Sequence, residues 1–159
     1  MPKITAVLHT RNDALRLGRA LDSLRPCDEV LIIDGGSEDE TVRVAQEHGA
    51  RVKSAIPGVT PGACAMDANH PWILVVRPDK ALSDDLEASL QEWKQREPNN
   101  GVACYKVTIR EQKKEDRWEQ SQPEVRLVNR ELVNWVGEMP PNRTCEATLQ
   151  GDLLRFHDP

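Results

Sequence analysis

The sequence predicts a mixed α/β fold, a sheet flanked by helices, and three observations support this prediction. The apolar runs at residues 4–8 and 30–33 do not alternate with polar residues, which is typical of strands covered on both faces. A helical pattern follows each run, so the chain begins as a parallel strand–helix–strand unit. Both strands end in polar turns, and such sheets bind ligands beyond the carboxyl ends of their strands. A binding site is therefore expected at those two turns.

The first two helices have start and stop signals. Asn12 or Asp13 can cap the first helix, whose expected buried face consists of Leu17, Ala20, Leu21 and Leu24. The second helix has Ser37 as its expected N-cap, with Glu40 three residues later, the pattern of a capping box. Its expected buried face consists of Thr41, Val44, Ala45 and His48. Gly49 supplies the left-handed stop, while Ser37 can be a helix cap or a site residue, and the sequence leaves both roles open.

The elements that follow complete the first half of the sheet and cover it. Residues 51–54 predict a short third strand, and residues 72–76 predict a fourth, buried strand. Between them, residues 56–70 are rich in Pro and Gly, which favours a mobile loop as much as a short helix. A helix is expected over residues 83–96, with Leu82, Leu86, Leu90 and Trp93 on one face. Trp93 is therefore expected in the core.

The pattern changes to strands beyond the Pro-Asn-Asn-Gly sequence at residues 98–101. Strands are expected at residues 102–110, 124–128 and 152–156, as an antiparallel edge of the mixed sheet. Residues 110–117 carry charges of both signs, which indicates a solvated hairpin tip. Trp118 and Trp135 are expected to pack in the core, because large aromatic residues are scarce in this chain.

The two polar turns resemble those of a known enzyme family. The first reads Thr10-Arg11-Asn12, and the second reads Asp34-Gly35-Gly36-Ser37-Glu38-Asp39-Glu40-Thr41. This spacing resembles the opening of family 2 glycosyltransferases, inverting enzymes of the GT-A fold with a Thr-x-Asn turn and an Asp-x-Gly-Ser-x-Asp-x-Thr turn. The resemblance implies that Thr10, Asn12 and Asp34 hold the base and ribose of a nucleotide-sugar donor, usually a uridine-type nucleotide. The expected donor site also includes their neighbours in these turns, Arg11, Ser37 and Asp39.

The resemblance extends over most of the chain. Residues 72–83 match a family segment that reads Trp, apolar strand, Asp-x-Asp-Glu and x-Leu-Ser. Residues 123–130 are similar to a Pro-x-x-Arg-Leu strand of the lipopolysaccharide-core subset. Residues 153–157 resemble a strand with a His that relatives use midway through their length, so the chain is expected to be a short member.

The segment Arg77-Pro78-Asp79-Lys80 departs from the family, whose Asp-x-Asp segment helps to bind a divalent cation. Asp79 is the carboxylate that remains, and it can hold Mg2+ or Mn2+ together with substrate phosphates. Arg77 and Lys80 disfavour a divalent ion, yet both can contact phosphate oxygens directly. A metal site at Asp79 and a metal-independent phosphate site at Arg77 and Lys80 are therefore the two alternatives.

A catalytic base is expected at Glu138. The family often carries a His-Glu pair a few residues after a Gly, and this chain has Gly137, Glu138 and then two prolines in that neighbourhood. Glu138 is the substitute that can deprotonate an acceptor hydroxyl. The four histidines form no constellation, so each is expected to be a satisfied structural residue.

Length, charge and cysteine use set limits on function. The 159 residues suit a single domain, with residues 1–80 as a nucleotide-binding half and residues 81–159 as an acceptor-side half that relatives extend further. A net charge of -5 argues against a nucleic-acid partner. With no leader or long apolar run, the chain is expected to be cytoplasmic and without a membrane span. The cysteines lack zinc-site or redox spacing, so all are expected to be free thiols: Cys27, Cys64, Cys104 and Cys145.

Two functions remain open at this point. A family 2-like glycosyltransferase would transfer a sugar, with inversion, from a nucleotide-sugar donor to a hydroxyl of a glycan or lipid-linked acceptor. A catalytically inactive relative would instead bind a nucleotide or a partner protein. The sequence specifies neither the sugar, nor the acceptor, nor the oligomeric state.

Overall fold

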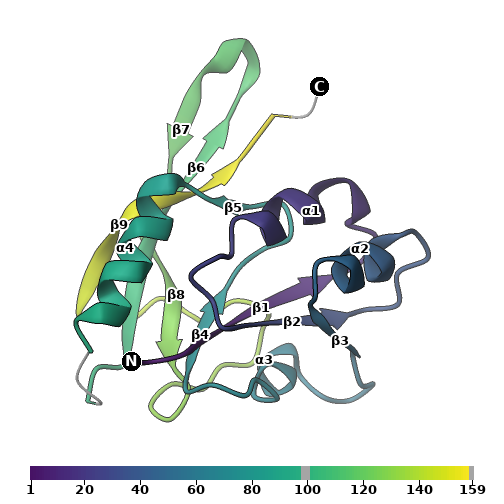
Figure 1. The fold of residues 1–159 in the computed structure, drawn as a ribbon, viewed down its shortest axis with the longest axis horizontal. Helices are drawn as coiled ribbons and strands as arrows, with labels where there is room; N and C mark the ends of the chain where they lie inside the picture. The colour runs from purple at the N-terminus through teal and green to yellow at the C-terminus, as the bar shows by residue number, and fades with distance from the viewer. Residues whose placement is uncertain (98–100, 158–159) are drawn as a thin grey trace.

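The computed structural model describes residues 1–97 and 101–157, so most of the predicted break at 98–101 lies outside the described residues. The sheet has the strand order β3-β2-β1-β4-β8-β6-β9-β5, and β7 pairs with β6 (Figure 1). Its parallel part consists of β1 (Ile4–Thr10), β2 (Glu29–Asp34), β3 (Arg51–Ser54) and β4 (Trp72–Val75). The predicted parallel opening of the sheet is confirmed.

The second half of the chain adds β5 (Ala81–Leu82), β6 (Cys104–Gln112), β7 (Trp118–Gln120), β8 (Glu124–Asn129) and β9 (Ala147–Arg155). Four strand pairs are antiparallel, as predicted: β4 with β8, β8 with β6, β6 with β7, and β5 with β9. The β6–β9 pair is parallel, because residues 130–146 return the chain to the start of β6 before β9 begins. The predicted hairpin tip contains a short 3-10 turn, η1 (Lys114–Asp116), and is exposed.

The helices are α1 (Ala14–Asp22), α2 (Thr41–Glu47), α3 (Pro61–Ala65) and α4 (Asp84–Gln95). The hydroxyl of Ser83 caps α4 by accepting a hydrogen bond from the Leu86 N–H at 3.1 Å. The hydroxyl of Thr60 accepts from the Ala63 N–H at 3.3 Å, and Pro61 occupies the first turn of α3. Of the two alternatives for residues 56–70, the short helix is therefore the one that the structure contains.

The predicted start of α2 is wrong. The helix begins at Thr41, and the Ser37 side chain does not cap it. The Asp39 carboxylate instead accepts the Thr41 N–H at 3.0 Å, since the turn is longer than a capping box allows. His48 is also not buried: it ends the helix as an exposed residue, and its Nδ1 contacts a backbone carbonyl. The stop is as predicted, because Gly49 has a φ of +78°.

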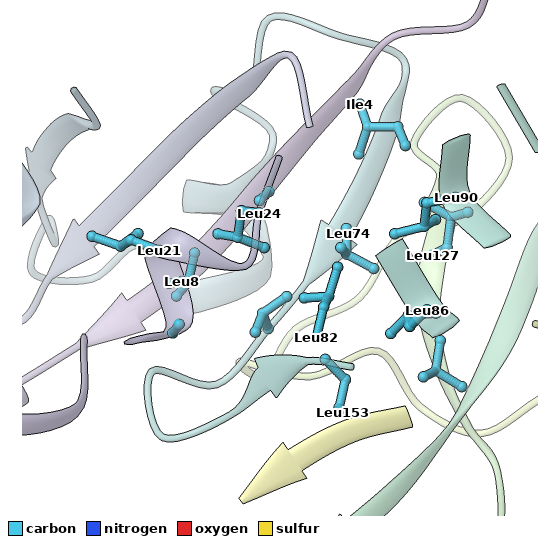
Figure 2. Packing of buried hydrophobic residues seen from close by; sticks show 14 of the residues in the cluster. Ile4, Leu8, Leu21, Leu24, Leu74, Leu82, Leu86, Leu90, Leu127 and Leu153 are labelled. Atoms are coloured by element: carbon cyan, nitrogen blue, oxygen red, sulfur yellow. The ribbon is translucent and has the colours of Figure 1, made fainter. Parts of the chain in front are cut away.

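Two apolar clusters cover the two faces of the sheet. Along β1, Ile4 and Leu8 join one cluster while Val7 joins the other. The first cluster contains buried leucines of α1 and α4 (Figure 2). The second contains Ala65 of α3 together with Trp135, which lies on the connection between β8 and β9. Strands β1, β2 and β4 therefore contribute buried residues to both faces, as their continuous apolar runs predicted.

The tryptophans divide between the core and the rim. Trp93 is buried as predicted and packs edge-on against Trp72, with ring centroids 4.9 Å apart. Trp135 is also buried as predicted. The prediction for Trp118 is wrong, since this residue is only half-buried and packs against Phe156 at the edge of the sheet, with centroids 5.7 Å apart.

Residues 130–146, here called the crossing connection, lie over the face of the sheet that α3 also covers. The N–H of Gly62 in α3 donates to the Val136 carbonyl at 3.0 Å. A Cβ atom on Gly62 would lie 1.8 Å from the carbonyl oxygen of Trp135, so the two segments meet where only glycine fits. The crossing connection is thus seated directly on α3.

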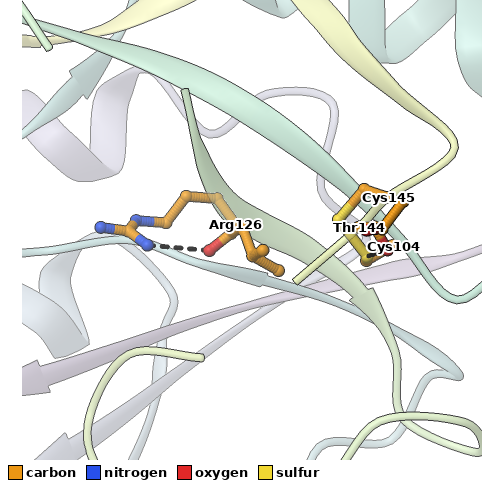
Figure 3. Close-up of a disulfide and its surroundings, with 5 residues drawn as sticks. Cys104, Arg126, Thr144 and Cys145 are labelled. Atoms are coloured by element: carbon orange, nitrogen blue, oxygen red, sulfur yellow. Dashed lines mark hydrogen bonds between the residues drawn. A yellow bond between two sulfur atoms is a disulfide. The ribbon is translucent and has the colours of Figure 1, made fainter. Parts of the chain in front are cut away.

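A disulfide between Cys104 and Cys145 fixes the far end of the crossing connection (Figure 3). The prediction of free thiols is therefore wrong for these two residues, and Cys27 and Cys64 are free. Spacing could not predict this pairing, because the two cysteines are 41 residues apart in sequence. Only the return of the chain to β6 brings their Cα atoms to 5.1 Å from each other. Burial raises the pKa of the Cys27 thiol to about 12, so this thiol is unreactive at neutral pH.

Among the described helices, none has the length and apolar character that crossing a bilayer requires.

Candidate functional site

The carboxyl ends of β1 and β2 meet at one edge of the sheet, as predicted. Thr10 lies in register with Asp34, and its hydroxyl donates to Asp34 Oδ1 at 2.8 Å. The Gly35 N–H donates to the Thr10 carbonyl at 2.8 Å. The Asn12 N–H donates to Ser37 Oγ at 2.9 Å, and Asn12 has a φ of +55°, a left-handed conformation that Asn tolerates well. The two polar turns therefore form one hydrogen-bonded unit.

The Asp34 carboxylate is buried and is used inside this unit. Its Oδ1 accepts hydrogen bonds from the hydroxyls of Thr10 and Ser37 at 2.8 and 2.5 Å. Its Oδ2 accepts from the backbone N–H groups of Gly36 and Ser37 at 3.1 and 2.8 Å. Burial raises the pKa of Asp34, but these hydrogen bonds outweigh it and hold the pKa below its usual value. In this structure, Asp34 and Ser37 shape the turn and do not line the neighbouring cleft.

An open cleft of about 1260 Å3 lies at this edge of the sheet. It is lined by most of the predicted site residues: Thr10, Arg11, Asn12, Asp39, Arg77, Asp79, Lys80 and Glu138. The first turn and the 77–80 segment follow neighbouring parallel strands, β1 and β4, so the fold brings them together. Because the cleft lies beyond the carboxyl ends of these strands, it occupies the position where open parallel sheets bind ligands.

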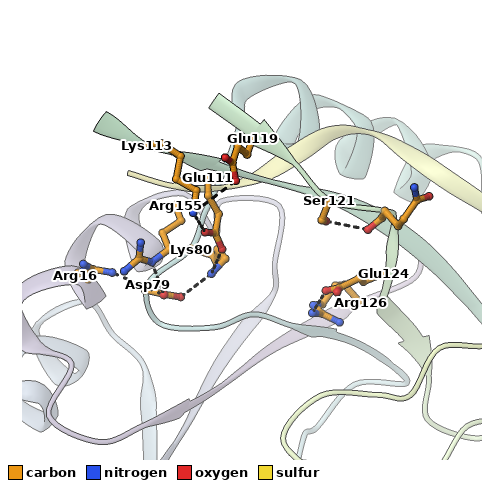
Figure 4. A network of polar contacts seen from close by, with 11 residues as sticks. Arg16, Asp79, Lys80, Glu111, Lys113, Glu119, Ser121, Glu124, Arg126 and Arg155 are labelled. Atoms are coloured by element: carbon orange, nitrogen blue, oxygen red, sulfur yellow. Dashed lines mark hydrogen bonds and ion pairs between the residues drawn. The ribbon is translucent and has the colours of Figure 1, made fainter. Parts of the chain in front are cut away.

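Asp79 stands at the centre of a group of cations in the cleft (Figure 4). Its Oδ1 accepts from Lys80 Nζ at 3.1 Å, and its Oδ2 accepts from Arg155 Nε at 3.0 Å. The Arg16 guanidinium lies 3.7 Å from the same Oδ2. Burial raises the pKa of Asp79, but the charges and hydrogen bonds of Lys80 and Arg155 outweigh burial and lower it, so the carboxylate is ionised at neutral pH.

The residues around Asp79 do not fit a divalent metal ion. Both oxygens of Asp79 are engaged by cations, which a metal would have to displace. The carboxylates of Asp13 and Asp39 also line the cleft, and they accept hydrogen bonds from the backbone N–H groups of Arg11 and Ala14, respectively. Within residues 1–97 and 101–157, no three His, Cys, Asp or Glu side chains are grouped to hold a metal. Mg2+ and Mn2+ take oxygen ligands, and this arrangement offers them cationic neighbours.

Glu138 reaches the cleft from the crossing connection. It is exposed, and its charge acts on His9, which also lines the cleft. Burial lowers the pKa of His9 and Glu138 opposes this shift, so the imidazole is neutral at pH 7. The buried His9 Nε2 has no hydrogen-bond partner among the described residues. The prediction that every histidine is a satisfied structural residue is therefore wrong for His9.

The sequence did not predict the cleft residues that α1 and the end of β9 contribute. Arg16 and Arg19 lie on the polar side of α1, where side chains ordinarily face solvent. Phe156 follows β9, and the Arg19 guanidinium lies 4.4 Å from the centroid of its ring. The pairing of β9 with β5 carries Arg155 to Asp79 and Phe156 to the cleft, and no local pattern in the sequence records that pairing.

A smaller pocket of about 390 Å3 adjoins the cleft and shares Arg77, Lys80 and Met139 with it. It is also lined by Arg126 of β8, a residue that is 6% exposed and donates to the Glu124 carboxylate at 2.5 Å (Figure 4). Burial lowers the pKa of Arg126, an effect that Glu124 opposes and the charge of Arg77 reinforces. The Arg of the Pro-x-x-Arg-Leu strand thus lies beside the candidate site.

Sequence comparison finds relatives that match part of the chain. No protein-family model matches it. The chain is 35% identical over 96 residues to an uncharacterized glycosyltransferase of Rickettsia felis, and 34% identical over 93 residues to one of Rickettsia bellii. These matches cover 57% and 56% of this chain, and 34% and 32% of the relatives. The chain therefore spans about a third of the length of the curated relatives it matches.

Solved structures of low sequence identity share the fold. A crystal structure of S. aureus TarS, residues 1–349, has a TM-score of 0.56 at 18% identity and covers 69% of this chain and 36% of that one. Glucosyl-3-phosphoglycerate synthase from Mycobacterium tuberculosis, in complex with Mn2+, uridine-diphosphate and glucosyl-3-phosphoglycerate, has a TM-score of 0.51 at 20% identity. This match covers 66% of this chain and 43% of the synthase. These likenesses confirm the predicted GT-A fold.

Proposed function

We propose that this chain is a glycosyltransferase that binds a nucleotide-sugar donor in the cleft of about 1260 Å3. The observation that carries the proposal is the position of Thr10, which ends β1, and of Arg11 and Asn12, which follow it: all three line a cleft at the carboxyl edge of a GT-A sheet. The curated relatives named glycosyltransferases match over 96 and 93 residues, which supports the same class. Membership of family 2 and likeness to the lipopolysaccharide-core subset are part of this proposal.

The proposed donor site divides into two ends. Thr10, Arg11, Asn12 and Asp39 line the end where the base and ribose, of uridine type, would lie. Asp34 and Ser37 act on this end indirectly, because their hydrogen bonds hold the turn in shape. The diphosphate would lie near residues 77–80, whose side chains Arg77 and Lys80 can bind phosphate oxygens.

Transfer would proceed by a single displacement in which Glu138 is the general base. Glu138 would accept the proton of an acceptor hydroxyl, and the resulting oxygen would attack the anomeric carbon. The bond from that carbon to the diphosphate would break, releasing a nucleoside diphosphate and inverting the anomeric configuration. The smaller pocket lined by Arg126 adjoins the cleft and offers room for part of the acceptor, a glycan or a lipid-linked hydroxyl.

The test combines donor binding with turnover. Nucleoside diphosphates and their sugars are titrated into the protein by calorimetry, and donor hydrolysis or transfer is then followed as released nucleoside diphosphate. Glu138→Gln should lower kcat by about 100-fold or more while leaving the Kd of the nucleotide unchanged, because a general base acts on the acceptor. Glu131→Gln is the matched control, since Glu131 is exposed on the same crossing connection and does not line the cleft.

A non-catalytic nucleotide-binding relative is the second candidate. It is favoured by one observation, that Arg77 and Lys80 stand where the family carries acidic residues. Saturable nucleotide binding without turnover of any donor, in the parent and in Glu138→Gln alike, would establish this second function. Absence of binding by every nucleotide at millimolar concentration would exclude both.

A further inference from the structure

Three elements of the fold direct cations at one carboxylate in the cleft. Arg16 comes from α1, Lys80 from the segment between β4 and β5, and Arg155 from the end of β9. Their nitrogen atoms lie 3.7, 3.1 and 3.0 Å from the oxygens of Asp79. Glu111 Oε1 lies 4.0 Å from Lys80 Nζ, so three cations face two carboxylates, Asp79 and Glu111, and leave a formal excess of one positive charge.

These cations are partly shielded from water. The side chain of Lys80 is 7% exposed, and those of Arg16 and Arg155 are 28% and 32% exposed. Charges that are partly removed from water act more strongly on an anion than charges on an open surface. The excess is local, because the chain as a whole has a net charge of -5. An anion entering the cleft therefore meets a positive region on an acidic protein.

Arg77 extends this region toward the smaller pocket. It is exposed, it lines both cavities, and in the part of the chain that the structure describes it has no ion-pair partner. An arginine fork matches two phosphate oxygens at once, whereas a lysine acts as a point charge. The cluster of Arg16, Lys80 and Arg155, together with Arg77, thus offers both kinds of phosphate contact in one place.

We propose that Arg16, Lys80 and Arg155, anchored by Asp79 and extended by Arg77, hold the donor diphosphate without a divalent metal ion. The inference rests on the proposed function, because it names how that same donor site binds the diphosphate. Asp79 then has a structural role, since it gathers the three cations at the distances described above. The same cations would stabilise the negative charge that develops on the leaving diphosphate.

The first experiment uses the unmodified protein. The Kd values of UDP and of uridine are measured by calorimetry in EDTA and again in millimolar Mn2+. UDP should bind at least tenfold more tightly than uridine in EDTA, since only UDP carries the phosphates that the cations contact. The Kd of UDP should change by less than about twofold when Mn2+ replaces EDTA.

The second experiment removes single charges. Arg155→Gln and Arg16→Gln should each weaken UDP binding in EDTA by about tenfold and leave uridine binding unchanged. Arg43→Gln is the matched control, because Arg43 pairs with Glu40 and Glu47 on α2 and does not line the cleft. The Tm of each variant is measured, and uridine binding shows that the nucleoside end of the site is intact.

The outcomes separate this inference from the proposed function. UDP binding that requires Mn2+ would overturn the metal-independent site and leave the donor site in place. Equal affinity for UDP and uridine in EDTA would also overturn it, because the phosphates would then make no contact. UDP binding in the Arg155→Gln and Arg16→Gln variants that equals that of the parent would remove these residues from the site. Absence of UDP and uridine binding in both conditions would overturn the donor site itself, and this inference with it.

Discussion

Replacing Asp34 tests whether its carboxylate holds the two polar turns together. Asp34→Ala removes the acceptor of two hydroxyls and two backbone N–H groups. Asp34→Asn keeps one oxygen for the N–H groups of Gly36 and Ser37, and the two hydroxyls can rotate to accept from its amide. The alanine variant therefore loses the acceptors, whereas the asparagine variant loses only the charge.

The size of the effect follows from these four hydrogen bonds. A buried donor left unpaired costs about 1–3 kcal/mol. Hydroxyls can turn toward other acceptors but backbone N–H groups cannot, so two fixed donors give a cost of about 3 kcal/mol for Asp34→Ala. Loss of charge assistance alone gives about 1 kcal/mol for Asp34→Asn. Because 1 kcal/mol shifts the Tm of a domain of this size by about 2–4 °C, the expected losses are about 6–12 °C and about 2–4 °C.

Urea denaturation at pH 7, followed by circular dichroism, measures these differences, and calorimetry with UDP measures the site. An alanine variant within about 1 kcal/mol of the parent would refute the reasoning, since the turn would then hold its shape without the carboxylate. A fully stable Asp34→Asn variant that no longer binds UDP would refute the claim that Asp34 acts only by holding the turn in shape. In that case the carboxylate would contact the nucleotide, as the family resemblance implied.

The same carboxylate gives a pH dependence with a defined sign. The pKa of Asp34 is below its ordinary value in the folded protein, so its contribution to stability is complete above the usual Asp pKa near 4. It is lost as the pH falls through the lowered value. The difference in unfolding free energy between the parent and Asp34→Asn should therefore be constant from pH 7 to about 5 and shrink below about 4. A difference that grows on acidification would contradict this assignment.

Two further predictions concern the crossing connection. Mass spectrometry of the unreduced protein should give a mass about 2 Da below the reduced chain, because Cys104 and Cys145 form a disulfide. Equal masses would contradict the pairing and agree with the expected cytoplasmic location, since cytosolic thiols are kept reduced. Gly62→Ala should lower the unfolding free energy by about 1–3 kcal/mol, because the new Cβ meets the backbone of Trp135. Gly137→Ala is the control, with its nearest neighbour 3.9 Å away, and equal stability of the two variants would contradict the close approach.

Local patterns predicted the parallel half of the fold well. Strands β1, β2 and β4 have continuous apolar runs, and α4 follows its N-cap Ser83 with its apolar face inward, so period and capping were sufficient. The same patterns placed Thr10 and Asn12 at the site, because a strand end and a polar turn are visible in the sequence. Ser37 was harder, since a serine before a helical pattern looks like a cap until its partner at Asp34 is known.

The remaining features depend on contacts between distant residues. The parallel pairing of β9 with β6 and the Cys104–Cys145 disulfide both arise from the path of the crossing connection. Arg155 reaches Asp79 only because β9 also pairs with β5. Single-sequence patterns report which side chains share a face of one element, but they do not report which elements become neighbours. Of the four cations in the proposed diphosphate site, the sequence therefore predicted Arg77 and Lys80 but not Arg16 and Arg155.

The crossing connection is attached to the rest of the fold at three residues. Trp135 is buried in the core, the Val136 carbonyl accepts a hydrogen bond from α3, and Cys145 forms the disulfide. Residues 137–144 lie between the last two attachments, and Glu138 and Met139 in this span line the cleft. Substitutions in the span can alter what the cleft accepts while the attachments keep the sheet unchanged. Mutational drift and directed evolution of acceptor choice can thus work on a short stretch of chain, and a library confined to it retains the scaffold.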